Sequence, residues 1–347
     1  MRNALLAAAL VLAAAGGARA QSTATLRGID VYRSTVLTSA EARKRFEPRL
    51  REYVNLRNMR SEGSHDKADD IRREIEGETR AIPGVAWAEL HVSEYFTSVD
   101  HAMYAVFDVV DRADSSRLAF SPAPKGAVKD PDGLLAAWKR YVAAGEAVSL
   151  RGEMSVDRPN CPGFYCLWGG TPELDAAQKT FVDGAASKGE DLKKVLRGSA
   201  DGEARAASLF VLSYSASGLD VVSLCHEALS DPDASVRGAA LQILADIANR
   251  HPALAIALDR VLPRLDDPVF SVRGKAMGLL VPLADRDAYR GKMLTAAPRL
   301  AELLRLNQPE SRDLAFTLLG ILSKKTYDRQ DYAAWDAWAA KAAAGRP

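Results

Sequence analysis

The chain of 347 residues lacks both an excess of one charge and the common catalytic motifs, and these absences exclude several classes of function. Lysine and arginine total 46 against 45 acidic residues, so the formal net charge is +1 at pH 7. This balance gives no electrostatic case for binding nucleic acid or an anionic membrane. The sequence holds no G-x-S-x-G elbow, no H-E-x-x-H pair, no P-loop and no G-x-G-x-x-G motif. We therefore expect no catalytic residues, no cofactor and no bound metal.

The five histidines and the acidic residues offer no cluster at metal-binding spacing. His91 and His101 could approach across a hairpin between two predicted strands, but a solvated hairpin explains them equally well. Asp108, Asp111 and Asp114 recur every three residues, whereas an EF-hand calcium loop needs alternate acids followed by glycine. We expect these three aspartates to keep a strand end soluble.

Cysteine is also scarce, with only Cys161, Cys166 and Cys225 in the chain. Cys161 and Cys166 enclose the turn sequence Pro162-Gly163, and this short loop predicts a local disulfide in an exported protein. Half of a metal site is the alternative, but no second pair with ligand spacing accompanies it. Cys225 falls on an apolar helical face, where we expect a free thiol that packs as a small hydrophobic side chain.

The one long hydrophobic run lies near the N-terminus, and residues 1–20 have the pattern of a signal peptide. A basic residue precedes an apolar stretch from Ala4 to Ala15, and Ala18 and Ala20 supply small residues for a signal peptidase. The stretch is shorter than the ~20 residues of a spanning helix, although an uncleaved anchor is the alternative. We therefore expect cleavage after Ala20, a periplasmic or secreted protein, and no stable membrane insertion afterwards.

After the signal, residues 21–112 predict a small α+β domain. The first strand alternates in polarity as a half-buried strand does, and Thr38 offers a hydroxyl cap to the helix that follows. A polar break separates the two helices, and Pro83-Gly84 ends the second. The predicted order is a strand at 26–32, a helix from Thr38, a helix from Asp66, and strands at 85–95 and 103–111.

The opening LRGIDVYRSTVLTSAEARKRF and this order of elements resemble a POTRA (polypeptide-transport-associated) domain over residues 25–112. In that family a similar strand leads into a helix, and a turn with glycine returns to two paired strands, as Pro83-Gly84-Val85 does here. The chain departs from the family pattern at Val85, where an aromatic residue is usual. A generic small α+β domain is the alternative.

Residues 113–173 are rich in proline and glycine and predict a connector with one short helix around residues 134–144. Bulky side chains gather at and just after the predicted disulfide loop. Such residues beside a disulfide favour a small satellite core over a ligand patch. They are Phe164, Tyr165, Leu167 and Trp168.

Two phrases in the second half of the chain repeat each other, DPDASVRGAA at 231–240 and DPVFSVRGKA at 267–276. Residues 174–347 predict four helix pairs, whose second helices carry arginines spaced by 32, 36 and 39 residues. Repetition at this period is typical of a solenoid, whose units bury their apolar faces only by stacking. These arginines are Arg205, Arg237, Arg273 and Arg312.

The phrase L-x-D-P-x-x-x-V-R-x-x-A resembles the HEAT-like repeat family, and the resemblance extends over residues 174–345. It implies a polar ladder between adjacent repeats, formed by Asp231 and Asp267 with Arg237 and Arg273. The alternative makes these arginines ligand contacts. From the residues themselves, we expect each aspartate to cap its second helix, with the following proline at the first helical position.

The C-terminal segment carries Trp335 and Trp338, three residues apart on a predicted helix. Exposed tryptophans would form an interaction patch. The resemblance to HEAT-like chains instead implies that this helix caps the open end of the array, because a terminal repeat leaves an apolar face uncovered.

The expected fold class is therefore an α+β N-terminal domain followed by an all-α HEAT-like helical solenoid. We expect an exported, non-enzymatic scaffold or adaptor that binds a protein or peptide partner in the cell envelope. Binding would use the array surface and an edge strand of the N-terminal domain. Candidate contacts of mixed charge, on the second helices off their packed stripe, are Gln242, Asp246, Lys275 and Arg312.

Two other functions remain open. One is a periplasmic enzyme with its site near residues 113–173. The other is a HEAT-like lyase or chromophore-binding protein, which one branch of the repeat family implies. The export signal and the lack of a dedicated reactive cysteine argue against the latter.

Overall fold

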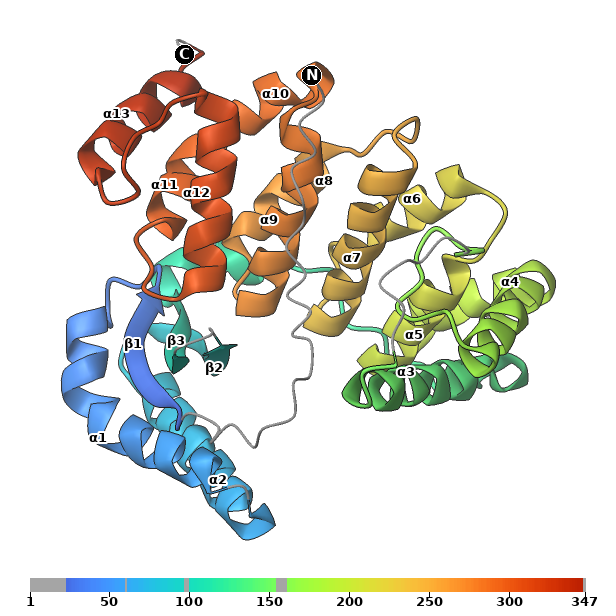
Figure 1. Cartoon of the computed structure of the whole chain (residues 1–347), viewed down its shortest axis with the longest axis horizontal. Helices are drawn as coiled ribbons and strands as arrows, with labels where there is room; N and C mark the ends of the chain where they lie inside the picture. Colours follow the sequence, from blue (N-terminus) through green and yellow to red (C-terminus); the bar gives the residue numbers. More distant parts are fainter. Residues whose placement is uncertain (1–22, 60, 97–99, 154–160, 346–347) are drawn as a thin grey trace.

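The computed structural model describes residues 23–59, 61–96, 100–153 and 161–345. The predicted signal peptide at 1–20 lies outside these residues. Figure 1 shows a small sheet with two helices, joined to an arc of packed helices that runs to the C-terminus. Within the described part of the chain, no helix combines the length and the apolar composition needed to cross a membrane.

The N-terminal unit has the order strand–helix–helix–strand–strand that the sequence predicts. Its elements are β1 (Thr25–Tyr32), α1 (Ser39–Asn58), α2 (Glu62–Arg80), β2 (Val85–Phe96) and β3 (His101–Asp111). Helix α1 starts with a capping box, in which Thr38 Oγ1 accepts from Glu41 N and the Glu41 carboxylate accepts from Thr38 N. Helix α2 begins at Glu62, earlier than expected, because the Ser61 side chain caps it and the polar segment is part of the helix.

The three strands form one sheet with β3 in the centre. Strand β3 pairs in parallel with β1 and antiparallel with β2. One face of the sheet packs against α1 and α2, and this small core includes Phe46, Leu50 and Ile75 from the helices and Leu90 and Phe107 from the strands. The other face of the sheet turns toward the C-terminal helices, so both faces are covered.

The connector holds two short 3₁₀ turns, η1 (Arg112–Leu118) and η2 (Pro131–Gly133), and one helix, α3 (Leu134–Leu150). The predicted disulfide is present between Cys161 and Cys166, whose Cα atoms lie 5.7 Å apart. Such a bond is compatible with an oxidising compartment.

The bulky side chains of the disulfide loop do not form a satellite core. Tyr165 is buried in the main core of the helical region, and Phe164, Leu167 and Trp168 pack against the same core. The loop is held there by hydrogen bonds, since Phe164 N donates to Ser213 O and Tyr141 Oη accepts from Trp168 N. Helix α3 brings Trp138 and Tyr141 into this core, which the sequence did not reveal because the two segments are separated along the chain.

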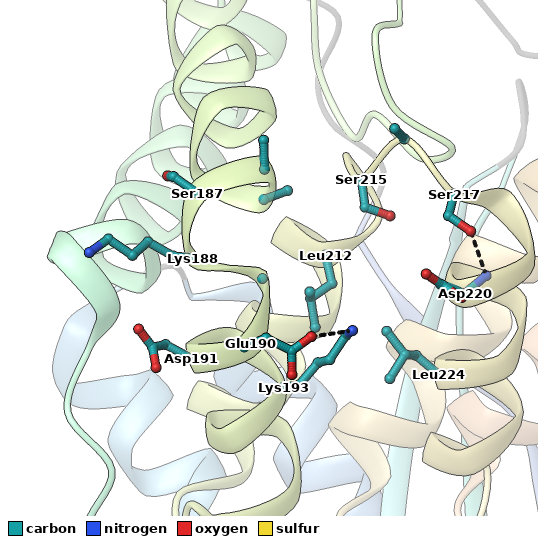
Figure 2. A pocket seen from close by; sticks show the side chains of 14 residues that line it. Ser187, Lys188, Glu190, Asp191, Lys193, Leu212, Ser215, Ser217, Asp220 and Leu224 are labelled. Carbon is teal, nitrogen blue, oxygen red and sulfur yellow. Dashed lines mark hydrogen bonds and ion pairs between the residues drawn. The ribbon is translucent and has the colours of Figure 1, made fainter.

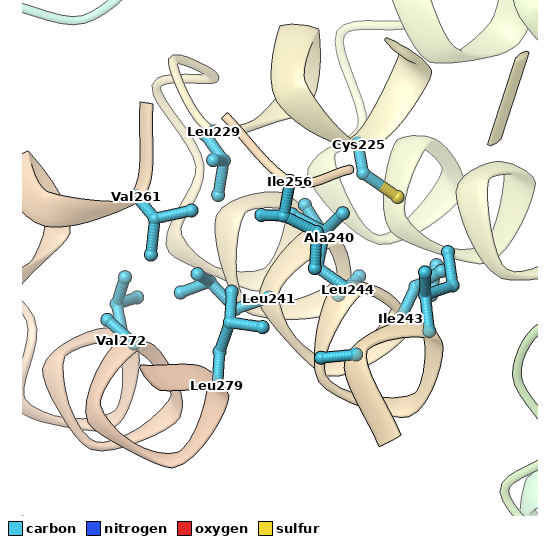
Figure 3. Packing of buried hydrophobic residues seen from close by; sticks show 14 of the residues in the cluster. Cys225, Leu229, Ala240, Leu241, Ile243, Leu244, Ile256, Val261, Val272 and Leu279 are labelled. Carbon is cyan, nitrogen blue, oxygen red and sulfur yellow. The ribbon is translucent and has the colours of Figure 1, made fainter. Parts of the chain in front are cut away.

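The remaining chain is helical, and its helices pack in pairs. They are α4 (Pro172–Gly198), α5 (Gly202–Leu212), α6 (Gly218–Ala228), α7 (Ala234–Arg250), α8 (Leu258–Val261) with η3 (Leu262–Asp266), α9 (Phe270–Ala284), α10 (Asp287–Leu294), α11 (Ala297–Leu303), α12 (Pro309–Ser323) and α13 (Tyr332–Ala343). Helices α5, α7, α9 and α12 contact one another in that order. In Figure 3, Leu241 of α7 lies close to Val272 and Leu279 of α9, which shows how neighbouring units share one apolar core.

Helix α13 packs against α11 at the C-terminal end of this row. Trp335 is fully buried and Trp338 is nearly so, with the two rings edge to face at 6.3 Å. Trp335 Nε1 donates to Asp328 O, so the polar atom of the buried indole is satisfied. The two tryptophans are therefore core residues of the last unit and do not form an exposed patch.

We predict that Cys225 does not react with iodoacetamide in the native protein. The thiol is fully buried, and burial raises its pKa far above the usual range, so little thiolate is present to react. Mass mapping of the exported protein should find Cys161 linked to Cys166 and Cys225 alkylated only after unfolding. Alkylation of Cys225 without denaturant would contradict its placement in the core.

Candidate functional site

Four arginines occupy the same place at the start of four parallel helices. Each is the fourth helical residue, in α5, α7, α9 and α12 respectively. Three of them are buried, and these are among the few buried charges of the helical region. The set is Arg205, Arg237, Arg273 and Arg312.

The first two arginines make the same set of hydrogen bonds. Arg237 Nη1 donates to Asp231 O at 2.9 Å and Pro232 O at 3.0 Å, in the turn that precedes its own helix. Its Nε and Nη2 donate to the two carboxylate oxygens of Asp267, in the next repeat, at 2.7 and 2.8 Å. Arg205 binds Asp231 in the same two-pronged way. A bidentate guanidinium–carboxylate pair is the strongest geometry for such a bond.

The aspartates are placed differently from the helix caps that we expected. Asp231 Oδ1 accepts from Asp233 N and Asp267 Oδ1 accepts from Val269 N, so each carboxylate orders its own turn. Helix α7 starts two residues later than predicted and is capped by Asp233, and α9 has Val269 at the cap. The prediction of Asp231 and Asp267 as caps was wrong because both carboxylates face the preceding repeat, where an arginine holds them.

The fourth unit lacks the aspartate that the ladder requires. Leu306 stands six residues before Arg312, where Asp231 and Asp267 stand before their arginines. The N-terminal domain supplies the missing carboxylates from two strands. Asp108 of β3 accepts from Arg273 Nη2 and from Phe270 N, and Asp30 of β1 accepts from Asn307 N and Gln308 N.

This contact decides how the two parts of the protein sit together. Tyr32 lies 3.9 Å beneath the Arg273 guanidinium and donates its hydroxyl to Leu265 O at 2.8 Å. A side chain at Gly28 could not fit there, because its Cβ would come within 2.8 Å of Asn307 Cβ. The sequence analysis did not identify Asp30 and Asp108 as residues of the contact between the two domains. Their partners lie well over a hundred residues away along the chain.

Two of the three aspartates expected to solubilise a strand end have other roles. Asp108 and Asp111 are buried. Burial acts to raise the pKa of the Asp111 carboxyl. The hydrogen bonds that it accepts from Ser34 Oγ, Thr35 N and Thr35 Oγ1 together outweigh burial and hold that pKa below the usual range. Only Asp114 lies at the surface, where it pairs with Arg33 and Arg117.

The connector covers the ladder from outside. Arg117 Nε donates to Asp266 O, Ser121 N donates to Ser230 O, and Gly126 N donates to Gly198 O. The segment therefore follows the turns of successive repeats in reverse order. Phe120 lies with its ring 4.0 Å from the Arg237 guanidinium. The ladder arginines are thus enclosed by their own chain, which favours a structural role over ligand contact.

The four candidate contact residues do not form one cluster. Lys275 is half-buried and its Nζ lies over Gly238 of the neighbouring helix, where a Cβ would come within 2.9 Å of it. Burial lowers the pKa of Lys275, and the attraction of Glu310 opposes this. Desolvation likewise raises the pKa of Glu310. Lys275 and Glu310 thus link α7, α9 and α12 on one face, and Glu310 was not among the sequence candidates.

The other candidates are engaged elsewhere. Asp246 pairs with Arg250 at 3.2 Å, and Arg250 also donates to Phe164 O in the disulfide loop. Arg312 pairs with Asp313 and donates to Asn307 O. Gln242 is half-buried on α7. Only Gln242 and Lys275 therefore stay available on the same outward face of the row.

A cavity of about 360 Å³ lies between α4 and the turn joining α5 to α6 (Figure 2). Most of its charged side chains are in ion pairs, since Lys193 pairs with Glu190, Asp191 with Lys194 and Lys188 with Asp132. Among the described residues, no group of three or more histidine, cysteine or acidic side chains could hold a metal ion.

The two hairpin histidines lie apart, because His91 belongs to the array-facing side of the sheet and His101 to the other. His91 stacks on Phe270 of α9 at 4.4 Å, and His101 stacks on Phe96 at 4.1 Å and contacts Glu94. Burial lowers the pKa of His91, and Arg273 and then Arg72 lower it further. His91 is thus part of the contact between the N-terminal domain and the helices.

Comparison with known proteins identifies the central helices. A family model described as HEAT repeats matches residues 189–280, a little over a quarter of the chain. This segment holds both repeated phrases, and it supports membership of a HEAT-like repeat family for that part. No curated protein and no solved structure matches the chain.

We predict that Arg237→Ala lowers the free energy of unfolding by up to about 3–5 kcal/mol, because the buried Asp267 carboxylate loses its bidentate partner and keeps only the single contact with Arg264. The matched control is Arg197→Ala, which breaks an equally well-aligned but exposed pair with Glu227 and should cost below about 1 kcal/mol. Denaturant unfolding measures both. Equal costs for the two variants would show that the ladder has no special structural role.

We also predict that the wild-type protein loses stability as the pH falls through about 6.5, the ordinary histidine pKa. The pKa values of His91, His226 and His251 are lowered in the fold, so the unfolded chain takes up protons more readily. The three histidines therefore contribute to the free energy of unfolding above about pH 6.5. This contribution is lost as the pH falls toward their lower pKa values in the folded protein. The variant His91→Gln should show a shallower fall in Tm between pH 7.5 and pH 5 than the wild type, both ends being about a pH unit or more from 6.5. Parallel curves would contradict the burial of a neutral His91.

Proposed function

We propose that this protein is an exported, non-enzymatic adaptor that holds a protein or peptide partner on a HEAT-like solenoid. The observation that carries the proposal is the row of second helices α5, α7, α9 and α12, which pack side by side. Buried ladder pairs join α5 to the turn before α7, and α7 to the turn before α9. A rigid row of this kind offers a continuous surface without a reaction centre.

The outward face of this row has the chemistry of a polypeptide-binding surface. Lys275 and Glu310 supply opposite charges on adjacent helices, and Gln242 supplies an amide. Gly278 adds no side chain, and a Cβ there would meet open space. Mixed charge with small residues suits a protein or peptide better than a polyanion, so binding should depend only weakly on salt.

Several features support an envelope location. The disulfide suits an oxidising compartment, and the signal-like residues 1–20 would direct export. The N-terminal unit has the element order of a POTRA-like domain, a fold associated with polypeptide transport. We propose that it belongs with the array as one adaptor.

An enzyme with its site near residues 113–173 finds less support. The described part of that segment places its aromatic side chains in the core and its backbone along the ladder turns. The described residues of this segment do not bring a nucleophile and a base together beside an accessible cavity.

The test is a paired charge reversal, Lys275→Glu with Glu310→Lys, which exchanges the two charges of the proposed surface. We expect the affinity for a partner isolated from a periplasmic extract to fall about tenfold or more, as loss of about 1.4 kcal/mol would give. The control reverses the exposed pair Asp259→Lys with Lys292→Glu on the first helices and should change little. Isothermal titration with each purified variant measures the affinity.

Thermal unfolding of each variant serves as the check on folding. If the Lys275 and Glu310 reversal binds as tightly as its control, the outward face of the second helices is not the binding surface. A steep fall in wild-type affinity with salt would point to a polyanionic partner and contradict the proposal.

A further inference from the structure

A small pocket lies between strand β1 and helix α1, at the edge of the sheet that is farther from β2. Figure 1 shows β1 beside α1. The pocket is lined by residues 26–29 of β1 and by Arg43, Glu47 and Arg51 of α1. Its volume is about 120 Å³, which leaves room for a few water molecules or one small ion. The pocket shares no residue with the outward face of the second helices.

The three side chains from α1 recur every fourth residue, so they share one face of the helix. Arg51 donates from Nε and Nη2 to Glu47 Oε1 at 3.0 and 2.6 Å. Arg43 Nε lies 3.9 Å from Glu47 Oε2, which is too far for a hydrogen bond. Arg51 therefore holds the Glu47 carboxylate, whereas the Arg43 guanidinium has no hydrogen-bond acceptor within the described part of the chain.

Positive charge is in excess around the pocket. Arg27 of β1 brings a third guanidinium, and its Nη2 lies 3.0 Å from Asp100 Oδ2. Three guanidinium groups thus stand against two carboxylates, so one positive charge is uncompensated. The arginines on the other side of α1 differ, because Arg45 and Arg49 pair with Glu78 of α2.

The strand adds a neutral donor. Val31 N donates to Ser39 Oγ at 2.9 Å, so the backbone groups of Val31 point away from β3. In an extended strand the backbone groups of every second residue point to the same side, and Ile29 is both the next such residue and part of the pocket lining. The Ile29 N–H is therefore directed to the edge at which the pocket lies.

Glu47 decides which anion suits the pocket. A carboxylate repels an anion that has only acceptor oxygens, such as sulfate. Inorganic phosphate keeps at least one proton at neutral pH, so its P–OH group can donate to a carboxylate oxygen. Arg51 binds Oε1 of Glu47, and Oε2 accepts no hydrogen bond from the described residues. The site thus offers donors and one acceptor, as a protonated phosphate requires.

We propose that the pocket between β1 and α1 binds inorganic phosphate. The Arg43 guanidinium and the Ile29 N–H donate to phosphate oxygens, and the P–OH group donates to Glu47 Oε2. Arg27 adds positive charge from the strand. A guanidinium suits this ligand because its planar fork matches the geometry of phosphate oxygens. Phosphodiester headgroups of lipids have no P–OH group and do not match the site.

The first test compares Arg43→Gln with Arg45→Gln by isothermal titration of inorganic phosphate at constant ionic strength. Both variants remove one exposed arginine from α1, but Arg45 faces Glu78 and not the pocket. The wild type and Arg45→Gln should bind one phosphate per chain with a Kd of about 1 mM or tighter. Arg43→Gln should bind about tenfold more weakly, because charge-assisted hydrogen bonds are lost. Arg27→Gln takes the place of Arg43→Gln if the latter does not fold.

The second test compares phosphate with sulfate. The wild type should bind sulfate about tenfold more weakly, because sulfate has no proton for Glu47 and leaves that carboxylate facing an anion. Glu47→Gln replaces the carboxylate with an amide that can also donate. This variant should therefore bind the two anions with affinities within about threefold of each other.

Four outcomes would overturn the proposal. They are no phosphate binding to the wild type, equal weakening by Arg43→Gln and Arg45→Gln, equal affinity of the wild type for sulfate and phosphate, and binding to phosphatidylglycerol vesicles without binding of inorganic phosphate. The last outcome would assign the basic face of α1 to a membrane surface. The reversal of Lys275 and Glu310 should leave phosphate binding unchanged, so failure here and failure of the adaptor surface can be told apart.

Discussion

The structure depends on buried arginines, of which Arg205 and Arg237 each join one repeat to the next. One nitrogen of the guanidinium binds the turn before its own helix, and the other two bind the aspartate in the turn of the following repeat. A lone buried charge would be strongly unfavourable, so each arginine and its carboxylate must stay together. This requirement fixes the spacing and the rotation of neighbouring helices more narrowly than apolar packing alone, which tolerates exchange of one hydrophobic side chain for another.

The same requirement explains why the sheet of the N-terminal domain packs against the turns before α9 and α12. The fourth unit has no ladder aspartate, because Leu306 stands where the second and third units have Asp231 and Asp267. Asp108 then binds Nη2 of Arg273, and Asp30 orders the turn before α12. These two residues come from paired strands of one sheet, so the sheet acts as a preformed replacement for a repeat turn. The domain is thereby an integral part of the array and not a separate attachment.

Enclosure of the ladder also limits where partners can bind. The connector runs along the turns and places Phe120 on Arg237, so the most conspicuous charges of the repeated phrases are out of reach. The outward face of the second helices, with Lys275 and Glu310, lies away from the connector. Its mixed charges suit a polypeptide partner.

The sequence by itself determined the local features of this protein: the order of strands and helices in the first domain, the repeated units, and the disulfide between Cys161 and Cys166. These follow from periodicity, caps and short-range chain geometry, which act over a few residues. Only the tertiary structure decided the partner of Arg273, the burial of Asp30 and Asp108, and the position of Phe120. Those depend on which surfaces meet across the whole chain. An aspartate in a strand has the same local pattern whether it faces water or a buried arginine, so only docking of the two domains distinguishes the two.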